Sequence, residues 1–174
     1  MAEKPETKAS EENNIQDRQF SIQKIFTKDI SFETPNTPQI FGEEWNAGVN
    51  MQIANEASAV SEDLPGLYEV VLRITVTVNL GDKTAYLVEV HQAGLFHIAG
   101  LPQEAIEHML ATMCPNILFP FAREVVSDIV TRGGFPQLLL SPVNFEALYA
   151  HEKQKAQQKQ SDTTVDEDKT DVKH

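Results

Sequence analysis

The sequence predicts an α+β fold: a four-stranded antiparallel sheet with helices packed on one side. Three observations lead to this prediction. Residues 20–98 contain four runs in which apolar and polar side chains alternate, as in strands with one buried and one wet face. Residues 102–149 instead repeat apolar side chains every three or four positions, as amphipathic helices do. Segments rich in glycine, proline or aspartate separate the runs.

The clearest pattern is the pair of alternating runs from Leu67 to Ile98, separated by Gly81-Asp82-Lys83. Glycine and aspartate favour tight turns, so the two runs predict a long antiparallel hairpin. Two strands are not stable alone in water, so the rest of the chain must cover their apolar face. That face comprises Tyr68, Val70, Leu72, Ile74, Val76 and Val78 in the first run and Tyr86, Val88, Val90, Phe96 and Ile98 in the second.

Two further strands are expected before the hairpin. Residues 20–33 place Phe20, Ile22, Phe26, Ile30 and Phe32 on one parity. The prolines in 34–38 end this strand, because proline cannot donate to a sheet ladder. Residues 48–60 alternate more weakly. Between the two strands, residues 40–45 form an aromatic-rich crossover without a clear period.

The second half of the chain predicts helices. One begins after Pro102 and is expected to break at Cys114-Pro115, since proline removes a backbone donor. A second follows Pro120 and stops at the glycine pair after Arg132. Residues 135–142 predict an apolar loop between prolines, and Phe145 then leads a third helix.

The 174 residues predict one folded body at 20–150 with two polar ends. Residues 1–19 are expected to form a disordered arm, and 151–174 a polar tail that continues as helix for a turn or two. No stretch of 18 apolar residues is present, and the N-terminal residues do not resemble a signal peptide. The single cysteine, Cys114, forms no internal disulfide, and its apolar neighbours favour a packed thiol. A reducing cytoplasm is therefore the expected location.

The formal net charge of the chain is −12, and most of it lies in the body. Residues 20–150 carry 15 acidic and 6 basic side chains, a net charge of −9. Such a body argues against binding nucleic acid or an anionic membrane, both of which require clustered cations. Two interpretations stay open: the charge serves solubility, or it attracts a basic partner.

The sequence offers no catalytic motif. The five histidines have no metal-ligand spacing with cysteine or acidic residues, and no phosphate-binding loop or nucleophile elbow is present. Glu89 and His91 share a strand face, but no nucleophile is evident beside them. No enzymatic activity and no cofactor are therefore expected. Apolar residues crowd the non-periodic crossover and the post-helix loop, and these two segments predict either an elongated binding groove or ordinary core.

Three stretches resemble the bacterial protein-export chaperone SecB family. They are IFTKDISFETPNTP (25–38), the hairpin region 67–100, and MCPNILFPFAREVVSDIVTRGGFPQLLLSPVNFEALY (113–149). The resemblance implies an ATP-independent holdase that keeps precursor proteins unfolded for translocation and delivers them to the motor SecA. It also implies a homotetramer built as a dimer of dimers, with a sheet and helices on one side, which is the fold expected from the patterns above.

The resemblance and the side-chain character together assign three sets of site residues. The expected SecA-binding residues are Asp29, Glu33, Leu87 and Glu89. The expected client groove comprises Phe41, Trp45, Val49, Met51, Ile53, Phe135, Leu138, Leu140, Leu148 and Tyr149. Residues expected to affect subunit assembly are Val88, Val90 and Gln92, for which ordinary sheet core is the alternative.

Two other functions stay open. A specialised SecB-like holdase could serve a toxin–antitoxin system instead of general export. A small apolar-ligand carrier is a weaker alternative, because it needs one confined pocket with converging polar groups, and no polar cluster in the sequence supplies them.

Overall fold

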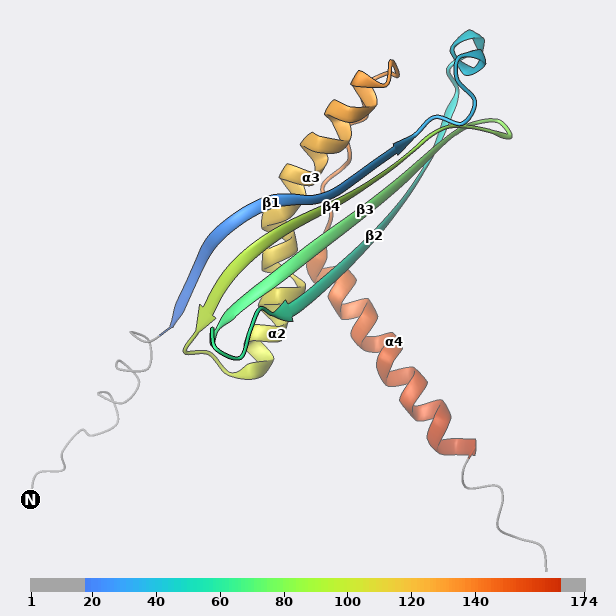
Figure 1. Cartoon of the computed structure of the whole chain (residues 1–174). Helices are drawn as coiled ribbons and strands as arrows, with labels where there is room; N and C mark the ends of the chain where they lie inside the picture. Colours follow the sequence, from blue (N-terminus) through green and yellow to red (C-terminus); the bar gives the residue numbers. More distant parts are fainter. Residues whose placement is uncertain (1–17, 167–174) are drawn as a thin grey trace, which may run out of the picture.

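The sheet has the predicted four antiparallel strands. The computed structural model describes residues 18–166, with side chains as far as residue 158. The strands are β1 (Gln19–Glu33), β2 (Ala47–Ala59), β3 (Leu67–Leu80) and β4 (Lys83–Ala99), with a short 3-10 helix, η1 (Gln39–Gly42), in the crossover. Their order across the sheet is β1-β4-β3-β2, so the predicted hairpin forms the centre (Figure 1). β1 and β2 are the edge strands.

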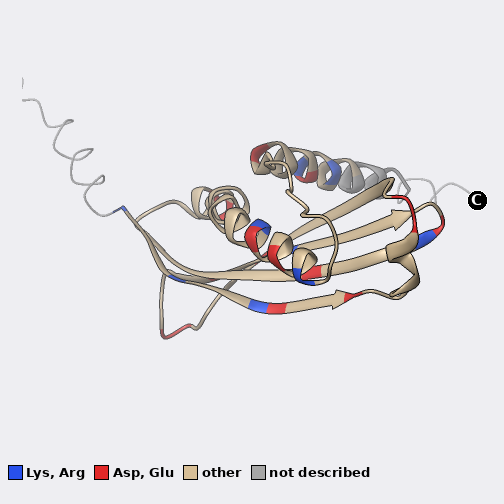
Figure 2. Ribbon diagram, turned by 90° about the horizontal axis from the view of Figure 1, so that it is seen from above, with Lys and Arg blue, Asp and Glu red and all other residues tan. Residues whose placement is uncertain are grey.

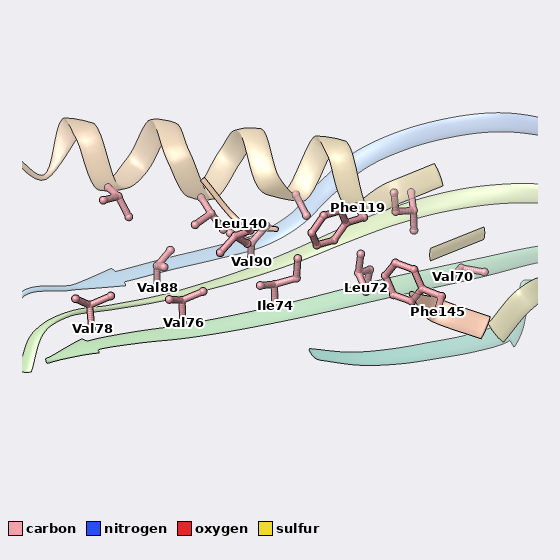
Figure 3. Packing of buried hydrophobic residues seen from close by; sticks show 14 of the residues in the cluster. Val70, Leu72, Ile74, Val76, Val78, Val88, Val90, Phe119, Leu140 and Phe145 are labelled. Carbon is pink, nitrogen blue, oxygen red and sulfur yellow. The ribbon is translucent and has the colours of Figure 1, made fainter. Parts of the chain in front are cut away.

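Three helices, α2 (Gln103–Ala111), α3 (Met113–Arg132) and α4 (Phe145–Asp166), lie on one side of the sheet (Figures 1 and 2). α3 packs directly over β4 and β3, whereas α4 contacts α2 and α3. We call the helix-bearing side the covered face and the other side the open face. Figure 3 shows the apolar side chains of β3 and β4 directed toward α3. Leu72, Ile74 and Val90 have no exposed surface, which confirms the predicted apolar face of the hairpin.

The predicted alternation in β1 is wrong at Phe26. The register with β4 shifts between Ile22 and Lys24 and again between Thr27 and Asp29. Each bulge adds one residue and reverses the parity, so the residues between the two bulges face the opposite way from the prediction. Phe26 therefore pairs with Ala93 on the open face. The second bulge restores the parity, and Ile30 and Phe32 lie on the covered face as predicted.

The predicted helix break at Cys114-Pro115 is also wrong. α2 ends at Ala111 and α3 begins at Met113, so only Thr112 separates them, and α3 then continues through both Pro115 and Pro120. Pro115 lies in the first turn, where its missing N–H has no helical acceptor to lose. Pro120 lies inside the helix and costs one backbone hydrogen bond. Leu118, Phe119 and Ala122 are buried around it, and their packing holds the helix across that position.

α4 is longer than the sequence indicates. It runs to Asp166, about four turns beyond residue 150, where the prediction allowed one or two. Asn144 caps its start by accepting a hydrogen bond from the Ala147 N–H at 3.0 Å. Farther along, His108 Nε2 donates to Glu146 at 2.9 Å and ties the first turn to α2. Of the predicted arm, only Arg18 and Gln19 are among the described residues. Residues 167–174 of the predicted tail also lie outside them.

Candidate functional site

The covered face extends beyond the helices at the edge strand β2. Val49 pairs with Val78 and Met51 with Val76, so both point to the covered face. Their neighbours in β3 are fully buried, yet Val49 is 51% and Met51 38% exposed. Ile53, one rung farther along, is half-buried. The strand therefore presents an apolar ledge to solvent.

A cluster of aromatic rings lies at the crossover, with Phe135 at its centre. The Phe135 ring centroid is 4.9 Å from that of Tyr86 and 5.1 Å from that of Phe41. Its centroid is also 6.0 Å from the Trp45 ring. Phe135 is only 5% exposed, whereas Phe41 is 53% and Trp45 42% exposed. The buried ring thus supports two outer rings that face solvent.

The remaining predicted groove residues also divide into buried and exposed side chains. Leu140 is buried beneath α3, as Figure 3 shows, and it belongs to the core. Leu138 is half-buried and packs against that core. On α4, Leu148 is exposed, while Tyr149 is half-buried with its ring 5.3 Å from that of His108. Phe135 and Leu140 are therefore core residues, whereas Phe41, Trp45, Val49, Met51 and Leu148 are the exposed members of the predicted groove.

The four predicted SecA-binding residues come together on the open face. Glu33 pairs with Leu87, and the adjacent rungs pair Ser31 with Glu89 and Asp29 with His91. In the described part of the chain, neither Asp29 nor Glu33 takes part in a salt bridge, so their charges are uncompensated. We call Asp29, Glu33, Leu87 and Glu89 the acidic group.

Two neighbouring side chains, Thr75 and His91, hold Glu89 by hydrogen bonds, and of these only His91 stood out in the sequence. Thr75 Oγ1 donates to one carboxylate oxygen at 2.8 Å, and His91 Nε2 lies 2.9 Å from the other. The Thr75 hydrogen bond, followed by that of His91, lowers the pKa of Glu89, and the positive charge of Arg73 acts in the same direction. The carboxylate is therefore fixed in direction and favoured in its charged form. Strand register is the signal that identifies Thr75, since Thr75 pairs directly with Glu89.

The three predicted assembly residues lie in the protomer core. Val88 and Val90 are 0% exposed under α3 (Figure 3). Gln92 is 2% exposed and accepts a hydrogen bond from Thr27 Oγ1 at 3.2 Å. Within one chain they have no free surface. Their influence on assembly stays a prediction, and it would act through the packing of β4 rather than through direct contact.

Three further observations concern metal binding, thiol reactivity and membrane insertion. Among residues 18–158, no three histidine, cysteine or acidic side chains gather as metal ligands would. Burial raises the pKa of the Cys114 thiol to about 12 and so keeps it protonated and unreactive at neutral pH. No helix in the described residues combines the length and apolar character needed to cross a membrane.

Comparison with known proteins gives consistent matches. The family model described as preprotein translocase subunit SecB matches residues 13–157. The protein-export protein SecB of Nitrosococcus oceani is 56% identical over 144 residues, covering 82% of this chain and 86% of that protein. The SecB of Methylococcus capsulatus is 50% identical over 155 residues, covering 89% and 98%. A SecB-like chaperone of Mycobacterium tuberculosis, solved with an antitoxin peptide, has a TM-score of 0.59 at 17% identity, covering 72% of this chain and 91% of that one.

Proposed function

This chain belongs to the SecB family, and we propose from this premise that it is an ATP-independent chaperone of protein export. It holds precursor proteins unfolded in the cytoplasm and delivers them to the motor SecA. Holding a client needs no covalent step, so the proposal includes no catalytic residue and no cofactor. The toxin–antitoxin alternative is not favoured, because the mycobacterial likeness at 17% identity supports the fold alone.

The observation that supports client holding best is the exposed apolar surface along β2 and the crossover. Phe41, Trp45, Val49 and Met51 stay exposed although a packed core lies directly behind them. Apolar burial contributes about 25 cal/mol per Å², independent of the client's sequence. Ordering an unfolded segment offsets much of this, so one contact site binds weakly.

Several grooves acting together overcome that weakness. We propose a homotetramer, a dimer of dimers, around which one long client wraps and gains avidity. In such an assembly, a neighbouring subunit on the helix layer would cover the exposed apolar side chains of Met113 and Phe121 on α3.

Delivery to SecA is assigned to the acidic group on the open face. Asp29, Glu33 and Glu89 offer uncompensated or hydrogen-bonded carboxylates on two strands. Charges of this kind steer a basic partner and lose strength as salt rises. Since the client groove borders the covered face, the two partners approach from opposite sides.

The experiment is suppression of refolding without nucleotide. A destabilised precursor is diluted from denaturant with or without the purified protein, whose mass is measured by light scattering. The proposal predicts a tetramer that halts refolding in the absence of ATP. Unimpeded refolding in the presence of intact tetramer contradicts it.

A further inference from the structure

The paired bulges of β1 place a large apolar side chain where the alternation would place a polar one. Phe26 pairs with Ala93 of β4, and Ala93 pairs on its other side with Val71 of β3. Opposite residues of antiparallel strands point to the same face, so all three lie on the open face. Ala93 is 0% exposed although no described helix covers that face, so Phe26 and Val71 must close over it. They form an apolar rung across three strands.

This rung begins an apolar strip that leads away from the acidic group. Leu95 follows on β4, and Leu67 pairs with His97 one rung farther on. The strip ends at an open hollow of about 340 Å³, beside which Leu64 is half exposed. The hollow is lined by Gln23, Leu64, Pro65, Leu67 and His97. We call Phe26, Val71, Leu95, Leu67 and Leu64 the apolar strip.

Charge divides the open face into two parts. Within the strip, Glu69 is neutralised by Lys28, whose Nζ lies 2.8 Å from its carboxylate. At the other part, Asp29 and Glu33 have no ion-pair partner in the described residues. A partner that is only basic would use the acidic group, and a partner that is only apolar would use the apolar strip. One segment with both properties matches the whole face.

We propose that the apolar strip extends the SecA-docking surface, so that one extended basic segment of the motor crosses the open face and inserts a large apolar side chain beside Phe26. The proposal rests on the proposed function, because it takes the acidic group as the docking site. Along β4, Ala93 lies four residues from Glu89, about 14 Å at ~3.4 Å per residue. His97 lies about 27 Å from Glu89 on the same basis. The segment therefore carries its apolar anchor about four residues beyond its cations.

Continuity and charge together favour this occupant over the alternatives. The strip adjoins the acidic group on the same face, because the pair Phe26–Ala93 is followed on that face by the pair Asp29–His91. No described helix covers that side of the sheet (Figure 1). A second copy of this chain would bring the same uncompensated acids to the interface. An unfolded client is expected to bind the apolar ledge of β2 at the covered face, so it does not require the apolar strip. The acids steer the basic segment, and the strip then slows its release, because burial of an apolar anchor is insensitive to salt.

The test measures SecA affinity at low and high salt for the parent and for Phe26→Ala, Phe26→Leu and Glu89→Gln. Phe26→Ala is expected to weaken binding about tenfold at both salt concentrations, as loss of an anchor side chain does. Phe26→Leu, the matched control, keeps an apolar side chain and retains most of the affinity. Glu89→Gln weakens binding mainly at low salt and flattens the salt dependence.

The remaining outcomes distinguish this proposal from the proposed function. Parental affinity in Phe26→Ala, with weakened Glu89→Gln, removes the strip from the docking surface but leaves the proposed function intact. Absence of SecA binding by the parent protein overturns both. If Phe26→Ala instead reduces precursor capture or changes the mass of the oligomer, the strip is occupied by a client or a second copy, and the proposal is wrong.

Discussion

Phe135 supports the aromatic part of the client groove, and Phe135→Ala removes that support. The side chain is 5% exposed and contacts the rings of Tyr86, Phe41 and Trp45. Replacing a buried phenylalanine with alanine costs roughly 3–5 kcal/mol of unfolding free energy, depending on how far the site collapses. Because Phe41 and Trp45 have a free side and are able to move inward, we expect a loss near the lower end, about 3 kcal/mol.

The assay is urea unfolding at fixed protein concentration, followed by fluorescence. Trp45 is the only tryptophan in the chain, so its emission reports on the crossover directly. The alanine variant should show red-shifted native emission and weaker capture of an unfolded precursor. Phe135→Leu, a matched control that keeps an apolar filling, should lose less than about 1.5 kcal/mol. A loss below about 1 kcal/mol in Phe135→Ala, with unchanged Trp45 emission, would refute the supporting role.

Three further outcomes are expected. Thr75→Val removes the hydroxyl that chiefly lowers the pKa of Glu89, so the midpoint should rise toward the ordinary value of 4.5 in an NMR titration, and an unmoved midpoint contradicts the assignment. Because the pKa of Glu89 is lowered in the folded protein, its carboxylate stays charged above that pKa. Any SecA affinity that this charge supplies should therefore be lost only as the pH falls through the lowered pKa. Loss of SecA affinity at higher pH would point to another titrating group. The Cys114 thiol should react with a thiol reagent at pH 8 only after unfolding, since its pKa is about 12, and fast reaction of the native protein would show that the residue is accessible.

The alternation of apolar and polar residues was sufficient to predict the sheet. In the β3–β4 hairpin, the alternation together with the position of the turn also indicates a bulge. A two-residue turn at Gly81-Asp82 pairs Leu80 with Lys83 and, if continued, would place Glu89 opposite Ile74. Opposite residues share a face, yet Glu89 belongs to the polar parity and Ile74 to the apolar one. The structure resolves this with a shift between Val78 and Asn79, which brings Thr75 opposite Glu89. The parity of the two runs therefore required an extra residue.

The bulges in β1 have no comparable signal. The two shifts cancel, so residues outside them keep the parity that the sequence predicts, and only Lys24, Ile25, Phe26 and Thr27 change faces. The residue types do not reveal this, because phenylalanine is common on either face of a half-covered sheet. The prolines of α3 led to a wrong prediction of a helix break. Their local propensity favours a break, but burial of the surrounding side chains stabilises the helix and overrides that propensity.

The candidate sites were predicted unevenly. The choice of Asp29, Glu33, Leu87 and Glu89 came from the resemblance to the SecB family, and strand parity accounts only for their common face, because they occupy polar positions of two paired strands. The groove depends on loops, where residue type does not determine exposure. Phe135 and Phe41 lie in comparable apolar contexts in the sequence, yet one is buried and the other exposed by the way the loop folds against η1.

The central claim is that clients and SecA use opposite faces of one sheet. It is tested most directly by measuring precursor capture and SecA affinity for Met51→Ser and Glu89→Lys, each as an intact oligomer. The account predicts that Met51→Ser weakens precursor capture and leaves SecA binding unchanged, while Glu89→Lys does the reverse. If either substitution impairs both activities in an oligomer of parental mass, the two faces do not act separately and the account is contradicted.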